Sequence, residues 1–349
     1  MSEGTTPPPS PLRSRLWPSL LLLLLGGLVG GWGMHELHER KKVINPNIAT
    51  TIVPFHQTTG EYTFIQPLLF CRLPESTVLG EKDDLKQDVE DIINGMRRSH
   101  PDFEASVYYR DLNRGRWIGV NEEKEYTPAS LLKVIIMITY FKEAELDPQI
   151  LERPIVFTQD QADLLARAPL DRGTELALNT THTVDDLIER MITTSDNGAT
   201  YALLANVDNK NLNQVYRDLE LENPDASKRD FTINAREYSY FLRILFNATY
   251  LERSLSERAL SLLNKTEFND GLTKGIPTNI LVSHKYGESI SAKGAALNSL
   301  ELHDCGIIYH PKNPYLLCIM TRGQTLEPLL QGIQAISKKV YEDVSQEEK

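Results

Sequence analysis

The fold of this chain is best deduced from residues 127–133, which read TPASLLK and precede the apolar run VIIMI. Thr127 can cap a helix with Pro128 at its first position, and the apolar run predicts that this helix is buried. Ser130 then lies in the first turn, where free N–H groups and the helix dipole favour developing negative charge. Lys133 shares the face of Ser130, and burial disfavours its charged form, so it can accept the serine proton. A capping serine beside a solvated lysine is the alternative interpretation.

A second stretch, residues 191–200, reads MITTSDNGAT and ends an amphipathic helical pattern that begins at the capping sequence of residues 183–186. We expect the helix to end near Ser195, with Gly198 as its left-handed C-cap. Bonds from side chain to backbone would then fix the Ser195 hydroxyl and the Asn197 amide on one corner. This corner could relay a proton and hold a substrate amide. A simple helix-ending turn is the alternative.

The third stretch, residues 279–287, reads NILVSHKYG and predicts a strand that runs into a glycine. Lys285 near its end could bind a substrate carboxylate and influence the serine of the second stretch. Gly287 would let a substrate backbone approach closely. An exposed strand lysine is the alternative.

Together and in this order, the three stretches resemble the Ser-x-x-Lys, Ser-Asp-Asn and Lys-Thr-Gly motifs of class A β-lactamases and penicillin-binding proteins. Residues 275–277 leading to residues 284–287, and residues 302–309 followed by 314–317, are similar to this family as well. The likeness extends from residue 83 to the C-terminus.

The resemblance implies an α+β fold, in which an antiparallel sheet is flanked by N- and C-terminal helices and carries an inserted all-α domain. Residues 81–126 and 277–349 would form the α/β part, and residues 127–276 the mostly helical part. The residue patterns agree with this division. They predict strands at residues 105–110, 116–120, 279–284, 302–309 and 315–321, a helix at residues 83–98, and a C-terminal helix with apolar residues from 326 to 340 on one face.

The family's catalytic roles can be carried over onto the matching residues. The resemblance implies that Ser130 is the acylated nucleophile, that Lys133 is its base, and that Ser195 passes the proton to the leaving nitrogen. Asn197 would bind the substrate's side-chain amide. Lys285 would hold the substrate carboxylate and support the serine of the second motif.

The oxyanion hole would use the backbone N–H groups of Ser130 and Glu288, beside Gly287. The third motif departs from the family pattern at one residue. Tyr286 replaces the usual threonine; the tyrosine keeps a hydroxyl, but this larger side chain would either narrow the site or turn away from it. Glu288 adds negative charge near the place where a substrate carboxylate should bind.

Release of the acyl group is the step for which the sequence gives the weakest pattern. Class A enzymes carry a Glu-x-x-Leu-Asn loop whose glutamate activates the deacylating water, and this pattern is absent between Ser195 and Lys285. Glu222, within residues 218–224, is the best candidate for that role and is otherwise a loop carboxylate. Without a water-activating group, the acyl-enzyme would persist.

Three functions fit these observations. The first is a membrane-anchored serine hydrolase of β-lactamase type that opens β-lactam amides through an acyl-enzyme on Ser130. The second is a D-Ala-D-Ala carboxypeptidase or transpeptidase with slow deacylation. The third is a catalytically idle protein that binds cell-wall peptide. The expected partner is a small β-lactam or a peptide ending in D-Ala-D-Ala, and the expected state is a monomer without cofactor or metal.

Four segments are expected along the chain. Residues 1–15, rich in Pro, Ser and Thr, would be disordered. Residues 16–34 are uncharged and near the ~20 residues that a membrane-spanning helix needs, so we expect a retained single-pass anchor; a cleaved signal peptide is the alternative. Residues 35–80 would be a spacer with short strands, and residues 81–349 the catalytic domain. The motifs place that domain outside the cytoplasm, although the flanking positive charges slightly favour the opposite orientation.

Composition excludes some functions. The 349 residues carry a net charge of −11, which argues against a nucleic-acid-binding surface. The three cysteines include Cys305 and Cys318, which flank the turn-like segment HPKNP. They could face each other across a hairpin, but buried free thiols are the favoured interpretation. No Cys-x-x-Cys spacing indicates zinc.

Overall fold

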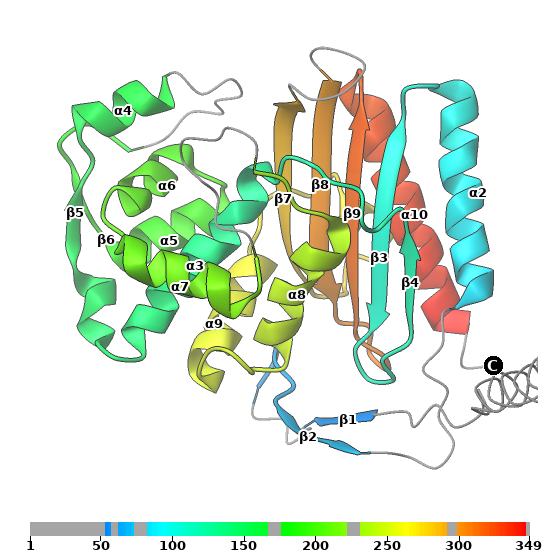
Figure 1. Cartoon of the computed structure of the whole chain (residues 1–349), viewed down its shortest axis with the longest axis horizontal. Coiled ribbons are helices and arrows are strands. Elements are labelled where there is room, and N and C mark those ends of the chain that lie inside the picture. The colour runs from blue at the N-terminus through cyan, green and yellow to red at the C-terminus, as the bar shows by residue number, and fades with distance from the viewer. Residues whose placement is uncertain are drawn as a thin grey trace, which may run out of the picture. The chain divides into compact units, whose positions relative to one another are not determined.

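A five-stranded antiparallel sheet lies at the centre of the structure (Figure 1). The computed structural model describes residues 53–56, 62–72, 82–166, 176–221, 231–291 and 299–346. The strands follow the order β4-β3-β9-β8-β7, with β7 at one edge. Their bounds are Glu104–Asp111 for β3, Trp117–Val120 for β4, Val282–Ser291 for β7, Ser299–Ile308 for β8 and Tyr315–Gly323 for β9. The predicted antiparallel sheet is therefore confirmed.

Both faces of this sheet are buried, because successive residues of a strand pack into opposite hydrophobic clusters. On β3, Tyr108 belongs to one cluster and Tyr109 to the other, and on β9 Leu316 and Leu317 divide in the same way. Such a sheet has no solvated face, so its polar side chains must find partners inside the protein.

Two terminal helices, α2 (Asp83–Ser99) and α10 (Leu326–Gln346), cover the face that carries Tyr109 (Figure 1). Their buried residues recur every three or four positions, as an amphipathic helix requires. These residues include Leu85, Val89 and Ile93 on α2, and Leu329, Ile333, Ile336, Val340 and Val344 on α10. The flanking terminal helices expected from the sequence are confirmed.

A helical layer covers the opposite face, which carries Tyr108. Its helices are α3 (Lys133–Ala144), α4 (Gln159–Leu165), α5 (Val184–Thr193), α6 (Asn197–Leu204), α7 (Asn209–Asp218), α8 (Ala235–Phe246) and α9 (Arg253–Asn264). Short 3-10 turns span Ala129–Leu132, Pro148–Glu152 and Leu272–Gly275, and a small ribbon pairs β5 (Pro154–Val156) with β6 (Thr181–Thr183). Every residue of α3 from Lys133 to Phe141 is buried, as the apolar run in the sequence predicts.

The segment before the sheet is fastened to the helical layer. The strands β1 (Val53–His56) and β2 (Leu68–Arg72) pair with each other. In the segment that connects these strands, three consecutive backbone N–H groups donate hydrogen bonds to the carboxylate of Glu257 on α9. These donors belong to Thr63, Phe64 and Ile65, at 2.7–3.1 Å. This carboxylate therefore holds an otherwise irregular stretch against the core.

Cys305 on β8 and Cys318 on β9 lie opposite each other in the sheet and form a buried disulfide. The favoured expectation of free thiols is therefore wrong. Spacing along the sequence could not show that the two strands pair in the register that brings these residues together.

The predicted membrane anchor, residues 16–34, lies outside the described residues. Within the part of the chain that the structure does describe, no helix combines the length and the apolar character needed to span a bilayer.

Candidate active site

Ser130 lies half-buried in the 3-10 turn Ala129–Leu132, directly before α3. The expectation that Thr127 caps an α-helix beginning at Pro128 is wrong, because α3 begins only at Lys133 and no side chain caps the turn. Ala129 has a φ of 49°, a left-handed conformation that residues with a side chain rarely adopt. The nucleophile candidate therefore sits on a sharp bend, and the chain before it needs external support.

That support comes from two buried side chains of β8, which bind the backbone N–H and the backbone carbonyl group of Thr127. The carboxylate of Glu301 accepts a hydrogen bond from the N–H of Thr127 at 3.0 Å. Nε2 of His303 donates to the carbonyl oxygen of Thr127 at 2.9 Å. Burial lowers the pKa of His303 more than the charge of Glu301 raises it, so the ring is neutral near pH 7. Neither Glu301 nor His303 belongs to a motif, so the sequence does not predict their role.

Glu301 is fully buried and is held in turn by a charged network. Arg322 on β9 lies 2.7 Å from its carboxylate, and the hydroxyl of Ser289 on β7 donates to it at 3.1 Å. Arg322 also contacts the half-exposed Glu104 at 3.2 Å. A buried carboxylate with this many partners is fixed in one position. The network therefore couples three strands to the bend before the serine.

Lys133 joins the first motif to the second. Its buried Nζ donates to the carbonyl oxygen of Ser195 at 2.6 Å and to Oδ1 of Asn197 at 2.7 Å, and lies 3.1 Å from Oγ of Ser195. Because Nζ donates to Oδ1, the contact turns the NH₂ group of the Asn197 amide away from Lys133. The structure thus brings three of the predicted site residues into one cluster.

The corner that carries Ser195 differs from the expected one. Helix α5 ends at Thr193, near the predicted position, but the left-handed residue is Ser195 itself, with a φ of 60°. Gly198 lies inside α6, whose N-cap is Asp196, with the Asp196 carboxylate accepting from the N–H of Ala199. The prediction of a Gly198 C-cap is therefore wrong, because Asp196 begins a new helix before the chain reaches the glycine.

The third motif lies on the edge strand β7, against the turn that carries Ser130. A side chain at Gly287 would place a Cβ atom 2.8 Å from the carbonyl oxygen of Pro128 and 3.3 Å from the N–H of Leu131. Only glycine permits this close approach. The position predicted to let a substrate approach therefore also serves to seat the nucleophile turn.

Lys285 and Tyr286 are both buried, and Nζ of Lys285 lies over the Tyr286 ring, 4.4 Å from its centroid. The ring of Tyr286 also stacks on Phe268, with centroids 4.1 Å apart. This contact explains how the larger side chain is accommodated where the family pattern has threonine. Glu288 is half-buried, and Glu222 lies outside the described residues.

The antiparallel sheet lies between two helical layers and carries a Ser-x-x-Lys turn, a Ser-Asp-Asn corner and a Lys-x-Gly edge strand, the arrangement of the β-lactamase-like serine hydrolases. The family model of the β-lactamase enzyme family matches residues 84–344, and the chain belongs to that family.

Solved structures confirm the fold. A mutant of PBP-A, solved as an acyl-enzyme complex with penicillin G, is 20% identical with a TM-score of 0.64, covering 76% of this chain and 98% of that one. A class A β-lactamase from Mycobacterium abscessus is 16% identical with a TM-score of 0.62, covering 75% and 99%. No curated protein sequence matches the chain.

Proposed function

We propose that this protein opens β-lactam amides through an acyl-enzyme on Ser130. The observation that carries the proposal is the contact of the buried Lys133 with Ser195 and Asn197. It links a candidate base next to the nucleophile with a second hydroxyl, which is the arrangement a proton relay needs.

In the proposed reaction, Lys133 takes the proton of the Ser130 hydroxyl while Oγ attacks the carbonyl carbon of the lactam. The negative charge on the carbonyl oxygen is stabilised by the N–H groups of Ser130 and Glu288. Loss of one such donor raises a barrier by about 3 kcal/mol. The proton then passes from Lys133 through Oγ of Ser195 to the ring nitrogen as the amide bond breaks. The proton that leaves Ser130 during the attack is thus the same proton that reaches the ring nitrogen when the amide bond breaks.

Substrate binding is assigned to the second and third motifs. The NH₂ group of Asn197 would receive the carbonyl of the substrate's side-chain amide. Lys285 would hold the carboxylate, and the stacked Tyr286 would form the wall beside it. The bulk of this wall favours substrates with a small group next to the carboxylate.

A D,D-peptidase is the second candidate. The observation that favours it is the absence from the sequence of a Glu-x-x-Leu-Asn pattern between Ser195 and Lys285. Glu222 would otherwise activate the water that releases the acyl group. If it does not, acylation by penicillin would give a long-lived adduct, and a peptide ending in D-Ala-D-Ala would be the natural substrate.

We further propose that the protein acts outside the cytoplasm as a monomer anchored by residues 16–34. Their uncharged sequence supports the anchor. The disulfide between Cys305 and Cys318 supports the compartment, because such bonds persist mainly where the surroundings are oxidising.

A fluorescent penicillin tests the acyl-enzyme directly. We expect the full-length protein to be labelled covalently, and Ser130→Ala to lose the label while Ser254→Ala, an exposed hydroxyl on α9, retains it. Absence of both label and hydrolysis in the wild type would refute both enzymatic functions and leave the idle binding protein. Rapid turnover that is lost in Glu222→Gln would establish the β-lactamase. A stable adduct together with release of D-Ala from peptide would establish the peptidase.

A further inference from the structure

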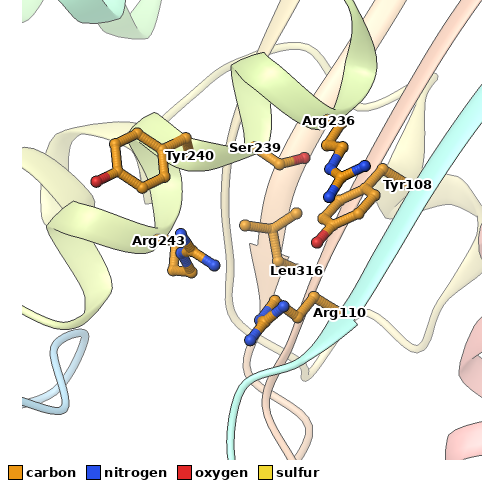
Figure 2. A pocket seen from close by; sticks show the side chains of 7 residues that line it. All are labelled: Tyr108, Arg110, Arg236, Ser239, Tyr240, Arg243 and Leu316. Carbon is orange, nitrogen blue, oxygen red and sulfur yellow. The ribbon is translucent and has the colours of Figure 1, made fainter. Parts of the chain in front are cut away.

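A cationic pocket lies between α8 and the sheet, on elements that carry none of the three motifs. Its volume is about 180 Å³, and its walls include Arg110 on β3 and Arg236 and Arg243 on α8. Figure 2 shows these three guanidinium groups around the same space, with the hydroxyl of Tyr108 among them and Tyr240 at the side of Arg243. None of the described residues that line this pocket carries a carboxylate.

The local sequence explains why the arginines converge. Arg236, Tyr240 and Arg243 are spaced by four and three residues, so they share one face of α8. Arg110 lies two residues after Tyr108 on β3, so both point to the face of the sheet that α8 covers. Two elements distant in sequence therefore present positive charge to the same cavity.

Two of these charges have no acidic partner. Within the described ranges, neither Arg110 nor Arg243 forms an ion pair. Arg236 lies 3.5 Å from Glu123, but both side chains are more than half exposed, so solvent screens that pair. Arg236 and Arg243 also lie over aromatic rings, those of Trp117 and Tyr240. Among the described residues, Arg110 and Arg243 therefore keep their charge without an ion-pair partner, in a protein whose net charge is −11.

The charges also act on each other. Burial lowers the pKa of Arg243, and the neighbouring charge of Arg110 lowers it further. Like charges held together in a half-buried site destabilise the folded protein unless an anion lies between them. Arginine is suited to this task, because its planar fork can bind two oxygens of one oxyanion.

We infer that this pocket binds a small multivalent oxyanion of the phosphate class, at a site separate from Ser130. Guanidinium groups from opposite walls match the spread of oxygens on a phosphate or diphosphate group. The tyrosine hydroxyl of Tyr108 can add a further donor. A cavity of about 180 Å³ has room for such a group but not for a drug-sized molecule.

Calorimetric titration of the full-length protein in non-ionic detergent with inorganic pyrophosphate, at constant ionic strength, tests this inference. We expect saturable binding that weakens at least about tenfold in Arg110→Gln and in Arg243→Gln, which remove charge from opposite walls. Arg253→Gln, at an exposed position on α9, should bind as the wild type does. A parallel titration with glycerol 3-phosphate distinguishes an organic phosphate from the free inorganic anion, and binding of either supports the site.

Thermal unfolding gives a second readout. Pyrophosphate should raise the Tm of the wild type and of Arg253→Gln but not that of the two pocket variants, whose own Tm should not fall because like charges are removed. Penicillin labelling should be equal in all variants, since the pocket shares no residue with the three motifs. The inference is overturned if neither phosphate binds, or if binding is as strong in both pocket variants as in the wild type.

Discussion

The carboxylate of Glu301 accepts a hydrogen bond from the backbone N–H of Thr127, three residues before Ser130. The carbonyl of the same residue is bound by His303. Glu301 and His303 on β8 therefore fix the residue that leads into the turn of Ser130, although neither belongs to one of the three motifs. They should therefore affect activity through the position of Ser130.

Glu301→Ala should reduce the free energy of unfolding by about 2–3 kcal/mol, because it removes the buried carboxylate that holds both Thr127 and the partly buried Arg322. It should also slow acylation by penicillin in the fraction that remains folded. Glu301→Gln keeps an acceptor for Thr127 and should recover part of the acylation rate. The matched control is Glu104→Gln, which removes the half-exposed partner of Arg322 and should cost less than about 1 kcal/mol. Denaturant unfolding measures the loss of stability, and stopped-flow labelling measures the acylation rate. Equal losses in Glu301→Ala and Glu104→Gln would contradict the role of Glu301 in holding Thr127.

Lys133→Met should slow acylation of Ser130 by about 10²–10⁴-fold, the usual contribution of a general base. Methionine fills the buried space without a charge, so the protein should remain folded. Lys142→Met, on the same helix but paired with Glu145 at its partly exposed end, is the control and should label at the wild-type rate. Single-turnover labelling gives the rate constants, and an unimpaired Lys133→Met enzyme would exclude the proposed base.

Gly287→Ala should destabilise the protein by about 1–3 kcal/mol and slow acylation, because the new methyl group meets the carbonyl of Pro128. The control is Gly95→Ala within α2, where the nearest atom is 3.6 Å away and belongs to the flexible side chain of Arg98. That change should instead stabilise the helix by up to about 1 kcal/mol. Thermal unfolding of both variants separates the steric clash at Gly287 from the effect of replacing any glycine by alanine. If Gly287→Ala left the Tm and the acylation rate unchanged, the turn would not need this close contact.

The stability of the protein should depend on pH through His303. Its pKa is lowered on folding from an unfolded value near 6.5. The unfolded chain therefore binds the proton first, so the stabilisation is complete above about pH 6.5 and is lost as the pH falls below it. His303→Gln, which keeps an N–H donor for Thr127, should flatten this part of the profile. Urea unfolding between pH 7.5 and about 5 measures the slope, and an unchanged slope in the variant would assign the dependence to other groups.

The sequence predicted the strands, the terminal helices and the buried helix after Ser130, because these depend on local apolar periodicity. It did not reveal the roles of Glu301 and His303. Polar and apolar residues alternate along the start of β8, and this pattern is the same whether the polar side chains face solvent or are buried. The left-handed Ser195 in place of Gly198 and the 3-10 turn before Lys133 were missed for a related reason. At Ser195 the competing signal is the N-cap of Asp196, which begins a new helix. At the 3-10 turn it is the contact of Thr127 with Glu301 and His303, which lie far away in the sequence.

The hydrogen bonds that Glu257 accepts from the three N–H groups of residues 63–65 also determine how a pulling force on the chain is transmitted. Tension applied to the chain before Thr63 would reach α9 and, through the bond from the N–H of Gln66 to the carbonyl of Phe246, α8. The helical layer would take the strain first. The bend at Ser130 and the edge strand beside it would then keep their geometry while the leading segment is pulled.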